Sequence, residues 1–205
     1  MNKLVEQLAP EYGFEIAPVE KADVAMEFTH PDSAPANLRR LALARIPTVC
    51  GTTGWYSELP AIAALFQEND TPLVTSPNFS VGVAVFKRLA GFAAELLKDQ
   101  TEYGAWAWEI HHDAKKDSPS GTLIQLVETM RQHGYSRFID TAASRAGKHP
   151  GTHEIGFDSA ADTITLRHSA RSREGFARGA LKSAQWILGR QGIYTFDDVL
   201  FPPNC

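Results

Sequence analysis

The sequence has 205 residues, of which 43% are hydrophobic, and 20 basic side chains stand against 24 acidic ones, giving a formal net charge of −4. Such a composition is that of a soluble globular chain with room for one large domain or two small ones. Its weakly acidic charge supplies no basic field for nucleic acid or an anionic membrane, so neither is expected as a partner. Two cysteines, Cys50 and Cys205, are too few for a disulfide framework and favour a cytoplasmic location. We find no signal-peptide pattern and no apolar run near the roughly 20 residues that span a bilayer.

The first part of the chain, to about residue 99, alternates short β-type runs with helical patterns. Strands are predicted at residues 14–17, 23–28, 48–50 and 73–75, and helices at 34–45 and 58–69. This alternation is typical of β-α-β units around a parallel sheet. After Ser80, apolar residues on helical spacing from Val83 to Leu97 predict a long helix.

The pattern changes after residue 100. The run YGAWAWEIHH, residues 103–112, predicts a strand. Its alternation places Trp106, Trp108, Ile110 and His112 on one face and Ala107, Glu109 and His111 on the other. Further on, we predict a helix at 122–132 with Ser120 as its N-cap, antiparallel strands at 152–158 and 163–169, and a helix at 174–190. The fold class is α/β, a parallel sheet followed by an α+β region with a mixed or antiparallel sheet.

The densest polar cluster is HHDAKKDSPSGT, residues 111–122, and its groups suit a small dicarboxylate. Lys115 supplies a positive charge, and residues 120–122 place hydroxyls and backbone N–H groups at a helix N-terminus, where the dipole favours an anion. The histidines add groups that exchange protons near neutral pH.

The residues of this cluster also leave other interpretations open. The loop can be a solvated surface turn, and His112 can be a hydrogen-bonded core histidine. A metal site could gather His111, His112, Asp113 and His153, but neither an H-x3-H nor a C-x2-C spacing supports it, so no metal is predicted.

Two further turns follow predicted strands. CGTTG at residues 50–54 and SPNFS at 76–80 stand where the carboxyl ends of parallel strands would bind a ligand in an open α/β sheet. Taken alone, each also fits an ordinary tight turn, and Phe79 can be a packing residue.

In combination and in this order, these segments resemble the dihydrodipicolinate reductase family. The resemblance is carried by ADVAMEFTHP (22–31), VCGTTGW (49–55), SPNFSVGV (76–83), EIHHDAKKDSPSGT (109–122), RAGKHPGTHEIGF (145–157), HSARSREGFARGAL (168–181) and the closing GIYTFDDVL. It covers nearly the whole chain, and the histidine pair followed by Lys-x-Asp-x-Pro-Ser-Gly-Thr is its most specific part.

The resemblance implies a role for each matching residue. His111 resembles the proposed acid and Lys115 its partner. The implied substrate ligands are His112, Ser120, Gly121, Thr122 and Thr53, and the implied cofactor-side residues are Phe28, Thr29, Gly51, Thr53, Ser76, Asn78, Phe79 and Arg173.

The reaction implied by the resemblance is hydride transfer from NADH or NADPH to a cyclic dicarboxylate, 4-hydroxy-tetrahydrodipicolinate, in diaminopimelate and lysine biosynthesis. The implied architecture is a Rossmann-like nucleotide domain from residues 1–79 and 174–205, and a substrate and oligomerisation domain from 80–173. The implied assembly is a homotetramer.

One family feature is missing from the sequence. Family members open with a strand and a G-x-G-x-x-G loop, whereas this chain contains no G-x-G triplet, and residues 1–8 resemble the helix that follows the loop. We therefore expect a nucleotide domain without its first strand, in which residues 14–17 and 23–28 move together or gain an unusual neighbour. Glu20 is the only nearby candidate for the adenosine ribose.

Three explanations of this departure remain open: an N-terminally short version of an ordinary reductase, a true loss of dinucleotide binding, and a cofactor site rebuilt from another chain or loop. The functions that follow are a reductase, a dicarboxylate-binding protein without redox activity, and, ranked last, a metal-dependent hydrolase.

Overall fold

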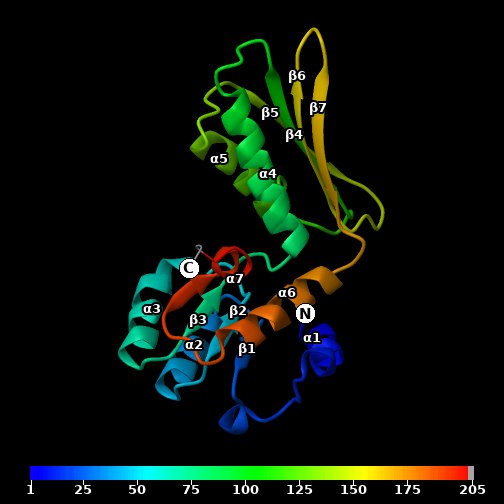
Figure 1. Ribbon diagram of the computed structural model, residues 1–205. Coiled ribbons are helices and arrows are strands. Elements are labelled where there is room, and N and C mark those ends of the chain that lie inside the picture. The colour runs from blue at the N-terminus through cyan, green and yellow to red at the C-terminus, as the bar shows by residue number, and fades with distance from the viewer. Residues whose placement is uncertain (203–205) are drawn as a thin grey trace. The chain divides into compact units, whose positions relative to one another are not determined.

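The computed structural model describes residues 1–202 and divides into two compact units. Unit 1 comprises residues 1–81 and the C-terminal segment from Glu174, and unit 2 comprises Gly82–Arg173. The chain thus leaves unit 1, builds unit 2 and returns to unit 1 (Figure 1). The division after Val81 lies near the expected boundary after residue 79, and Cys205 lies outside the described residues.

Unit 1 is built around a parallel sheet of short strands. Its strands are β1 (Ala25–Glu27), β2 (Thr48–Cys50), β3 (Leu73–Thr75) and β8 (Ile193–Thr195), in the order β1-β2-β3-β8. All three pairings are parallel, as the predicted β-α-β units require. Its helices are α1 (Asn2–Leu8), α2 (Ala34–Leu43), α3 (Leu59–Glu68), α6 (Glu174–Ile187) and α7 (Phe196–Leu200), with short 3-10 turns at Ala9–Tyr12, Val19–Lys21 and Tyr56–Glu58.

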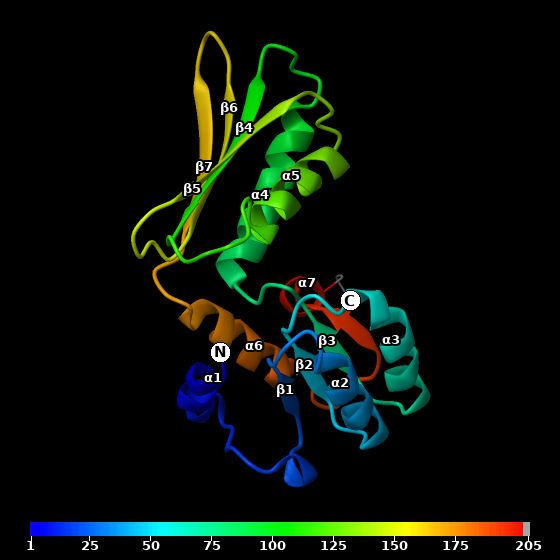
Figure 2. The ribbon, with the colours of Figure 1, turned by 180° about the vertical axis from the view of Figure 1, so that it is seen from behind.

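Helices cover both faces of this sheet. Leu38 of α2 and Ile62 and Phe66 of α3 are fully buried in a cluster that includes Leu73 of β3. On the opposite face runs α6, and α1 packs against it (Figures 1 and 2). The Rossmann-like class predicted for this part of the chain is confirmed.

The strand predicted at residues 23–28 is present as β1, but the strand predicted at residues 14–17 is wrong. Residues 14–17 form no strand, and among the described residues β1 is an edge strand whose only neighbour in the sheet is β2. The two segments therefore neither pair with each other nor gain another strand. The chain instead turns through Gly13, whose φ is +75°, and through the 3-10 turn Val19–Lys21 before it enters β1.

Unit 2 is a four-stranded mixed sheet with two helices on one face (Figures 1 and 2). Its elements are α4 (Val81–Leu97), β4 (Gly104–His111), α5 (Gly121–Gln132), β5 (Ile139–Arg145), β6 (Thr152–Asp158) and β7 (Thr163–Ser169), with strand order β5-β4-β6-β7. The antiparallel pair β6 and β7 has the predicted bounds. Strand β5, parallel to β4, was not predicted, because Ile139 is its only buried residue and its sequence carries no apolar alternation.

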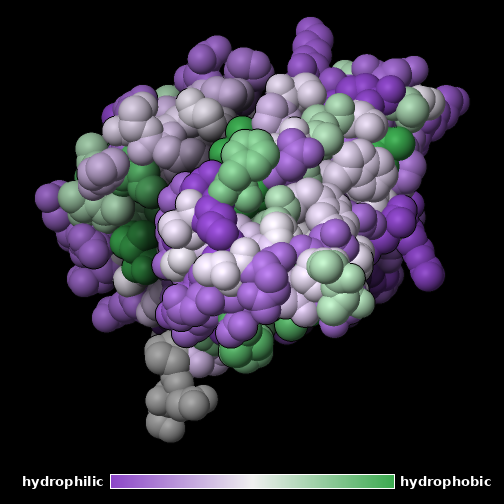
Figure 3. Space-filling model, turned by 90° about the horizontal axis from the view of Figure 1, so that it is seen from above, coloured by the Kyte–Doolittle hydropathy of each residue, from purple (hydrophilic) through white to green (hydrophobic). Residues whose placement is uncertain are grey.

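The core of unit 2 lies between the helices and one face of the sheet. It includes Phe86 of α4, Leu126 of α5, and Ala107, Ile155 and Phe157 of the sheet. The other face bears Trp106 and Trp108, which are half-buried. In the view of Figure 3, hydrophobic groups at the surface are separated by hydrophilic ones. Within residues 1–202, none of the helices has both the length and the apolar character needed to cross a bilayer.

Candidate active site

A buried carboxylate, Glu109, organises the polar side chains of unit 2. Alternation along β4 turns Glu109 and His111 toward the helix-covered face, and Glu109 is 0% exposed. Arg145, at the end of β5, donates to Oε1 of Glu109 at 2.8 Å, and so does the backbone N–H of Ser120 at 2.8 Å. Oε2 accepts the Ser120 hydroxyl and lies 3.2 Å from Nε2 of His153 on β6.

These partners keep Glu109 ionised. Burial alone disfavours the charged form, but the hydrogen bonds from Ser120 and Arg145 outweigh it and lower the pKa of Glu109. A buried carboxylate is tolerated when it is paired and hydrogen-bonded, as it is here. The network therefore fixes a negative charge beside the two histidines.

His111 and His153 lie together against this charge. Their ring centroids are 5.0 Å apart, and Nδ1 of His111 is 3.5 Å from Oε2 of Glu109. Burial lowers the pKa of both histidines, that of His153 to about 4, and the cations Lys115 and Arg145 lower the pKa of His111 further. His111 is therefore neutral at pH 7, and its buried Nδ1 has no hydrogen-bond partner.

The start of α5 carries the groups expected to hold an anion. Ser120 caps the helix, since its side chain accepts from the backbone N–H of Leu123, as predicted. Nζ of Lys115 donates to both oxygens of Asp117, at 2.8 and 2.9 Å. These bonds lower the pKa of Asp117, and the backbone of Gly121 contributes in the same direction. An internal carboxylate thus already lies between the lysine and the helix N-terminus.

The predicted site residues of unit 2 divide into those gathered around Glu109 and the start of α5, and the exposed residues His112 and Arg173. Glu109 brings His111 and Ser120 together, Lys115 acts electrostatically on His111, and Gly121 and Thr122 form the first turn of α5. His112 lies just beyond the end of β4 and is exposed, so its interpretation as a core histidine is wrong. Arg173 is exposed and is the last residue of unit 2.

The predicted cofactor-side residues of unit 1 follow the carboxyl ends of β1, β2 and β3. These residues are Phe28, Thr29, Gly51, Thr53, Ser76, Asn78 and Phe79. The rings of Phe28 and Phe79 meet edge to face with centroids 6.0 Å apart. Gly51 allows Phe28 to lie over the turn, since a Cβ at this position would come within 2.0 Å of the Phe28 ring.

Another carboxylate that sequence reasoning missed, Glu27, orders these loops. It is 3% exposed and accepts hydrogen bonds from the hydroxyls of Thr29 and Thr52 and from the amide of Asn37, the last at 3.2 Å. Thr52 in turn accepts from the backbone N–H of Thr29 at 2.9 Å. The loops after β1 and β2 are therefore tied to one buried charge.

Sequence reasoning also missed Glu109 and Arg145, and it considered His153 only as a metal ligand. The predicted alternation placed Glu109 on the same strand face as His111, and this could have identified Glu109 as a residue of the site. Arg145 and His153 meet Glu109 through the register of β4 with its neighbours, in which His111 pairs with Arg145 and Glu109 with His153.

Glu109, His111 and His153 could also be metal ligands. One ligand atom from each lies within 4.8 Å of the others. In the structure, however, Arg145 and Ser120 already bind the carboxylate. This set differs from the one weighed from the sequence, which contained His112 and Asp113.

The described residues fit one end of a nicotinamide cofactor better than the other. The aromatic and polar loops after β1, β2 and β3 could line a flat ring at the carboxyl edge of the sheet. A glycine-rich phosphate turn after a first strand is not found within residues 1–202, and α1 has only seven residues. The groups present fit the nicotinamide end and offer no site for the pyrophosphate.

Comparison with known families decides the assignment. The family model described as dihydrodipicolinate reductase, N-terminus, matches residues 14–79, and the model described as dihydrodipicolinate reductase, C-terminus, matches residues 82–200. The chain belongs to the dihydrodipicolinate reductase family. It is an oxidoreductase of this family, and the resemblance found in the sequence is confirmed.

Individual relatives agree with this membership. The 4-hydroxy-tetrahydrodipicolinate reductase of Christiangramia forsetii is 35% identical over 191 residues, 87% of this chain and 79% of that protein. The enzyme of the same name from Archaeoglobus fulgidus is 36% identical over 199 residues, 87% of this chain and 76% of its own length. The dipicolinate-bound dihydrodipicolinate reductase from Paenisporosarcina sp. TG-14 has a TM-score of 0.74 at 22% identity, covering 85% of this chain and 72% of that one.

Proposed function

We propose that this chain reduces 4-hydroxy-tetrahydrodipicolinate to tetrahydrodipicolinate with NADH or NADPH, in the cytoplasmic pathway to diaminopimelate and lysine. Family membership supports the reaction class, and the observation that carries the proposal is the network of Glu109, His111 and Ser120 beside Lys115. Reduced nicotinamide, when bound, supplies the hydride.

The residues of unit 2 would hold the substrate and provide the proton. Lys115, the backbone N–H groups of Gly121 and Thr122 and the exposed His112 bind carboxylates in this proposal, and a substrate carboxylate displaces Asp117 from Lys115. Two substrate carboxylates near His111 favour its protonated form and raise its pKa. The anionic Glu109 stabilises the imidazolium, which donates the proton that follows the hydride.

The residues of unit 1 would form the cofactor side of the reaction. Phe28 and Phe79 provide apolar surface for the nicotinamide, and Thr29, Gly51, Ser76 and Asn78 provide polar groups near it. Thr53, exposed after β2, provides a hydroxyl for the substrate. Arg173 provides a positive charge for the cofactor side. Glu27 keeps the first two loops in place by its bonds to Thr29 and Thr52.

The test is oxidation of NADH or NADPH by the purified chain with freshly generated substrate. His111→Ala should lower kcat by about 10²–10⁴-fold. Lys115→Ala should chiefly raise KM, because it removes a substrate charge partner. His133→Ala, which alters an exposed histidine at the far end of α5, is the matched control and should retain activity. Equal activity of the His111 variant and the control would refute the assigned acid.

A second candidate is dicarboxylate binding without reduction, and the observation that favours it is Lys115 in the loop before α5, which already binds both oxygens of a carboxylate, that of Asp117. It predicts that pyridine-2,6-dicarboxylate raises Tm whereas NADH and NADPH do not. A large rise in Tm with either cofactor alone would exclude this candidate.

We also propose a homotetramer. The face of the unit 2 sheet opposite α4 and α5 carries the half-buried Trp106 and Trp108, which a neighbouring copy could cover. Sedimentation equilibrium measures the mass directly. Trp108→Glu should lower that mass, whereas a wild-type mass equal to one chain would refute the assembly.

A further inference from the structure

Three possible metal ligands lie close together on two adjacent strands of unit 2. Within residues 1–202, Glu109, His111 and His153 form the only group of three such residues, with one ligand atom of each within 4.8 Å of the others. Oε2 of Glu109 is 3.5 Å from Nδ1 of His111 and 3.2 Å from Nε2 of His153. Zinc binds imidazole nitrogen and carboxylate oxygen at about 2.0–2.2 Å, and a tetrahedron with such bonds has edges of roughly 3.3–3.6 Å. Two edges of a zinc tetrahedron are therefore close to their required length.

The nitrogen of His111 that faces this carboxylate is available for a ligand. Nδ1 is buried, and none of residues 1–202 forms a hydrogen bond with it. A buried polar atom without a partner is unusual, and a bound ion is one of the groups that account for it. The side chain of His111 is 11% exposed, against 6% for His153 and 0% for Glu109. An ion would therefore reach the cluster along the ring of His111.

Protons compete weakly with a metal for the two histidines. A histidine binds a metal only in its neutral form. Burial lowers the pKa of both rings, that of His153 to about 4, so both are neutral at pH 7. An ion would have no imidazolium to deprotonate.

The second oxygen of Glu109 is already held by the protein. Arg145 and the backbone N–H of Ser120 both donate to Oε1, each at 2.8 Å. Carboxylates that bind a metal are commonly oriented by such hydrogen bonds. On Oε2, an ion would displace only the hydroxyl hydrogen of Ser120, whose oxygen also accepts from the N–H of Leu123. The network thus presents Oε2 toward the two histidines.

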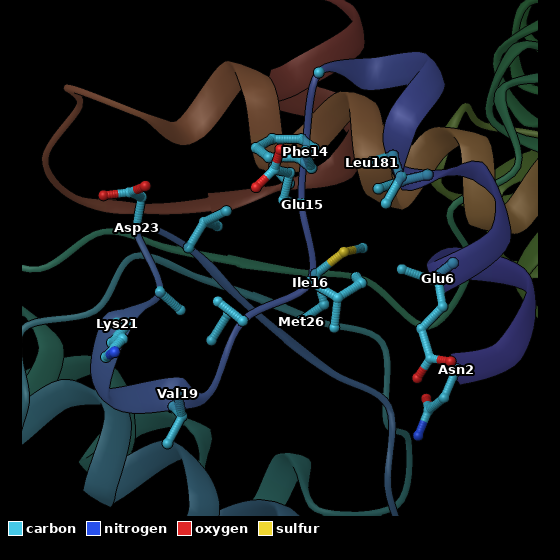
Figure 4. A pocket seen from close by; sticks show the side chains of 18 of the residues that line it. Asn2, Glu6, Phe14, Glu15, Ile16, Val19, Lys21, Asp23, Met26 and Leu181 are labelled. Atoms are coloured by element: carbon cyan, nitrogen blue, oxygen red, sulfur yellow. The ribbon is translucent and has the colours of Figure 1, made fainter.

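The acidic cavity of unit 1 offers no comparable donor set. This cavity, of about 640 Å³, is lined by Glu6, Glu15 and Asp23 but by no histidine or cysteine. In Figure 4, Glu6 and Asp23 lie on opposite sides of the view. Carboxylates alone suit Mg²⁺ or Ca²⁺, whereas two imidazoles with one carboxylate suit Zn²⁺.

We propose that Oε2 of Glu109, Nδ1 of His111 and Nε2 of His153 bind one Zn²⁺, with water in the fourth position, and that this ion inhibits the chain. An imidazole whose Nδ1 is bound to zinc cannot take up a proton there. His111 would then no longer form the imidazolium that donates to the substrate. The inhibition rests on the proposed function, whereas the zinc site does not.

The test of the site is equilibrium dialysis of the full chain, without a histidine tag, against Zn²⁺ at pH 7 and without substrate. His153→Gln should weaken binding at least tenfold, because loss of even an outer partner of a metal ligand costs about 10–100-fold. His133→Gln, at an exposed histidine near the far end of α5, is the matched control and should bind like the wild type. Co²⁺ in place of Zn²⁺ should give the intense visible absorption of tetrahedral cobalt.

Two results would overturn the zinc site. One is equal zinc affinity of His153→Gln and His133→Gln, and the other is the weak absorption of six-coordinate cobalt. If His153→Gln fails to fold, His111→Ala takes its place, and wild-type affinity in that variant would overturn the site equally.

The test of inhibition is NADH oxidation by the wild type at free zinc concentrations set by a metal buffer, with substrate below KM. Zinc should lower the rate, EDTA should restore it, and the half-inhibitory concentration should match the dissociation constant from dialysis. A discrepancy of more than tenfold would overturn the inhibition. Absence of NADH oxidation without zinc would refute the proposed function and the inhibition together, and the dialysis would still decide the zinc site.

Discussion

The two sheets of this chain differ in the length of their strands and in where their candidate functional residues lie. Strands of the parallel sheet in unit 1 have three residues each, whereas those of the mixed sheet in unit 2 have seven or eight. Long strands carry side chains from distant sequence positions into register, and this is how Glu109 meets His153 and His111 meets Arg145. Short strands leave function to the loops at their ends. Under the proposed function, the proton chemistry would depend on the interior of unit 2, and the cofactor side would depend on loops of unit 1.

The largest loss of stability is expected from a substitution that breaks the hydrogen-bond network around Glu109 in unit 2. Glu109→Gln leaves Arg145 and His153 beside a neutral partner, and losing one member of a buried ion pair costs about 3–5 kcal/mol. Glu154→Gln is the matched control, since Glu154 faces the exposed Arg167 at 3.6 Å and such a pair contributes about 1 kcal/mol or less. Urea unfolding measures both. Equal losses in the two variants would show that the network does not stabilise unit 2.

Acid should weaken unit 2 through the same histidines. His153 has a pKa of about 4 in the folded protein, below the ordinary 6.5, so the unfolded chain takes up its proton first as the pH falls. The contribution of His153 to the free energy of unfolding is fully present above pH 6.5 and is lost as the pH falls from 6.5 to 4. At about 1.4 kcal/mol per pKa unit, this loss is on the order of 3 kcal/mol. His111, shifted in the same direction, adds to this loss.

The measurement is the urea midpoint at pH 7 and pH 5, with hydrogen exchange to separate the two units. The comparison that isolates the contribution of His153 is with His153→Gln. This variant should show a shallower decline than the wild type, and a decline of the same steepness would disprove the assignment.

A smaller loss of stability is expected from a substitution that disturbs unit 1 alone. Gly179→Ala would place a Cβ 1.8 Å from the backbone oxygen of Phe79, so α6 must shift away from a predicted cofactor loop. Overpacking of this kind costs about 1–3 kcal/mol. Gly175→Ala in the same helix meets nothing closer than 3.8 Å and should be neutral or stabilising. Hydrogen exchange should show lost protection in unit 1 and not in unit 2; the reverse pattern would contradict the division into units.

The smallest effect concerns ligand affinity. Asp117→Asn frees Lys115 from an exposed ion pair and should tighten binding of pyridine-2,6-dicarboxylate by up to about fivefold, the range for such pairs. Asp113→Asn makes the same change in charge on an exposed carboxylate nearby and serves as control. Calorimetric titration gives both dissociation constants. If both variants gain equally, the effect is general electrostatics and not release of Lys115.

Sequence patterns predicted those helices and strands whose own hydrophobic residues determine their secondary structure. β2 and β3 are buried throughout and were predicted with their observed bounds, and the apolar stripe of α4 was equally clear. Residues 14–17 alternate like a strand, but a strand needs backbone partners, and no strand within residues 1–202 supplies them. β5 is the opposite case, since pairing with β4 makes a strand of a mostly polar segment.

The same distinction applies to the site. His111, Ser120 and Lys115 lie in one continuous motif and could be found from it. Arg145 and His153 join Glu109 only through strand register, which a local pattern does not contain. Glu27 was missed for a related reason: its partners Thr29, Asn37 and Thr52 come from three separate segments.

The insertion of unit 2 into unit 1 has a consequence for protein synthesis. β3 pairs with β8, Val74 with Tyr194, and the ribosome must make the whole of unit 2 between them. Until β8 emerges, the nascent chain presents β3 as an uncovered hydrophobic edge, while unit 2 can already fold from contiguous residues. Domains tend to fold as units during translation, and unpaired strand edges invite aggregation. During synthesis, the β3 edge of unit 1 therefore stays unpaired until the whole of unit 2 has been made.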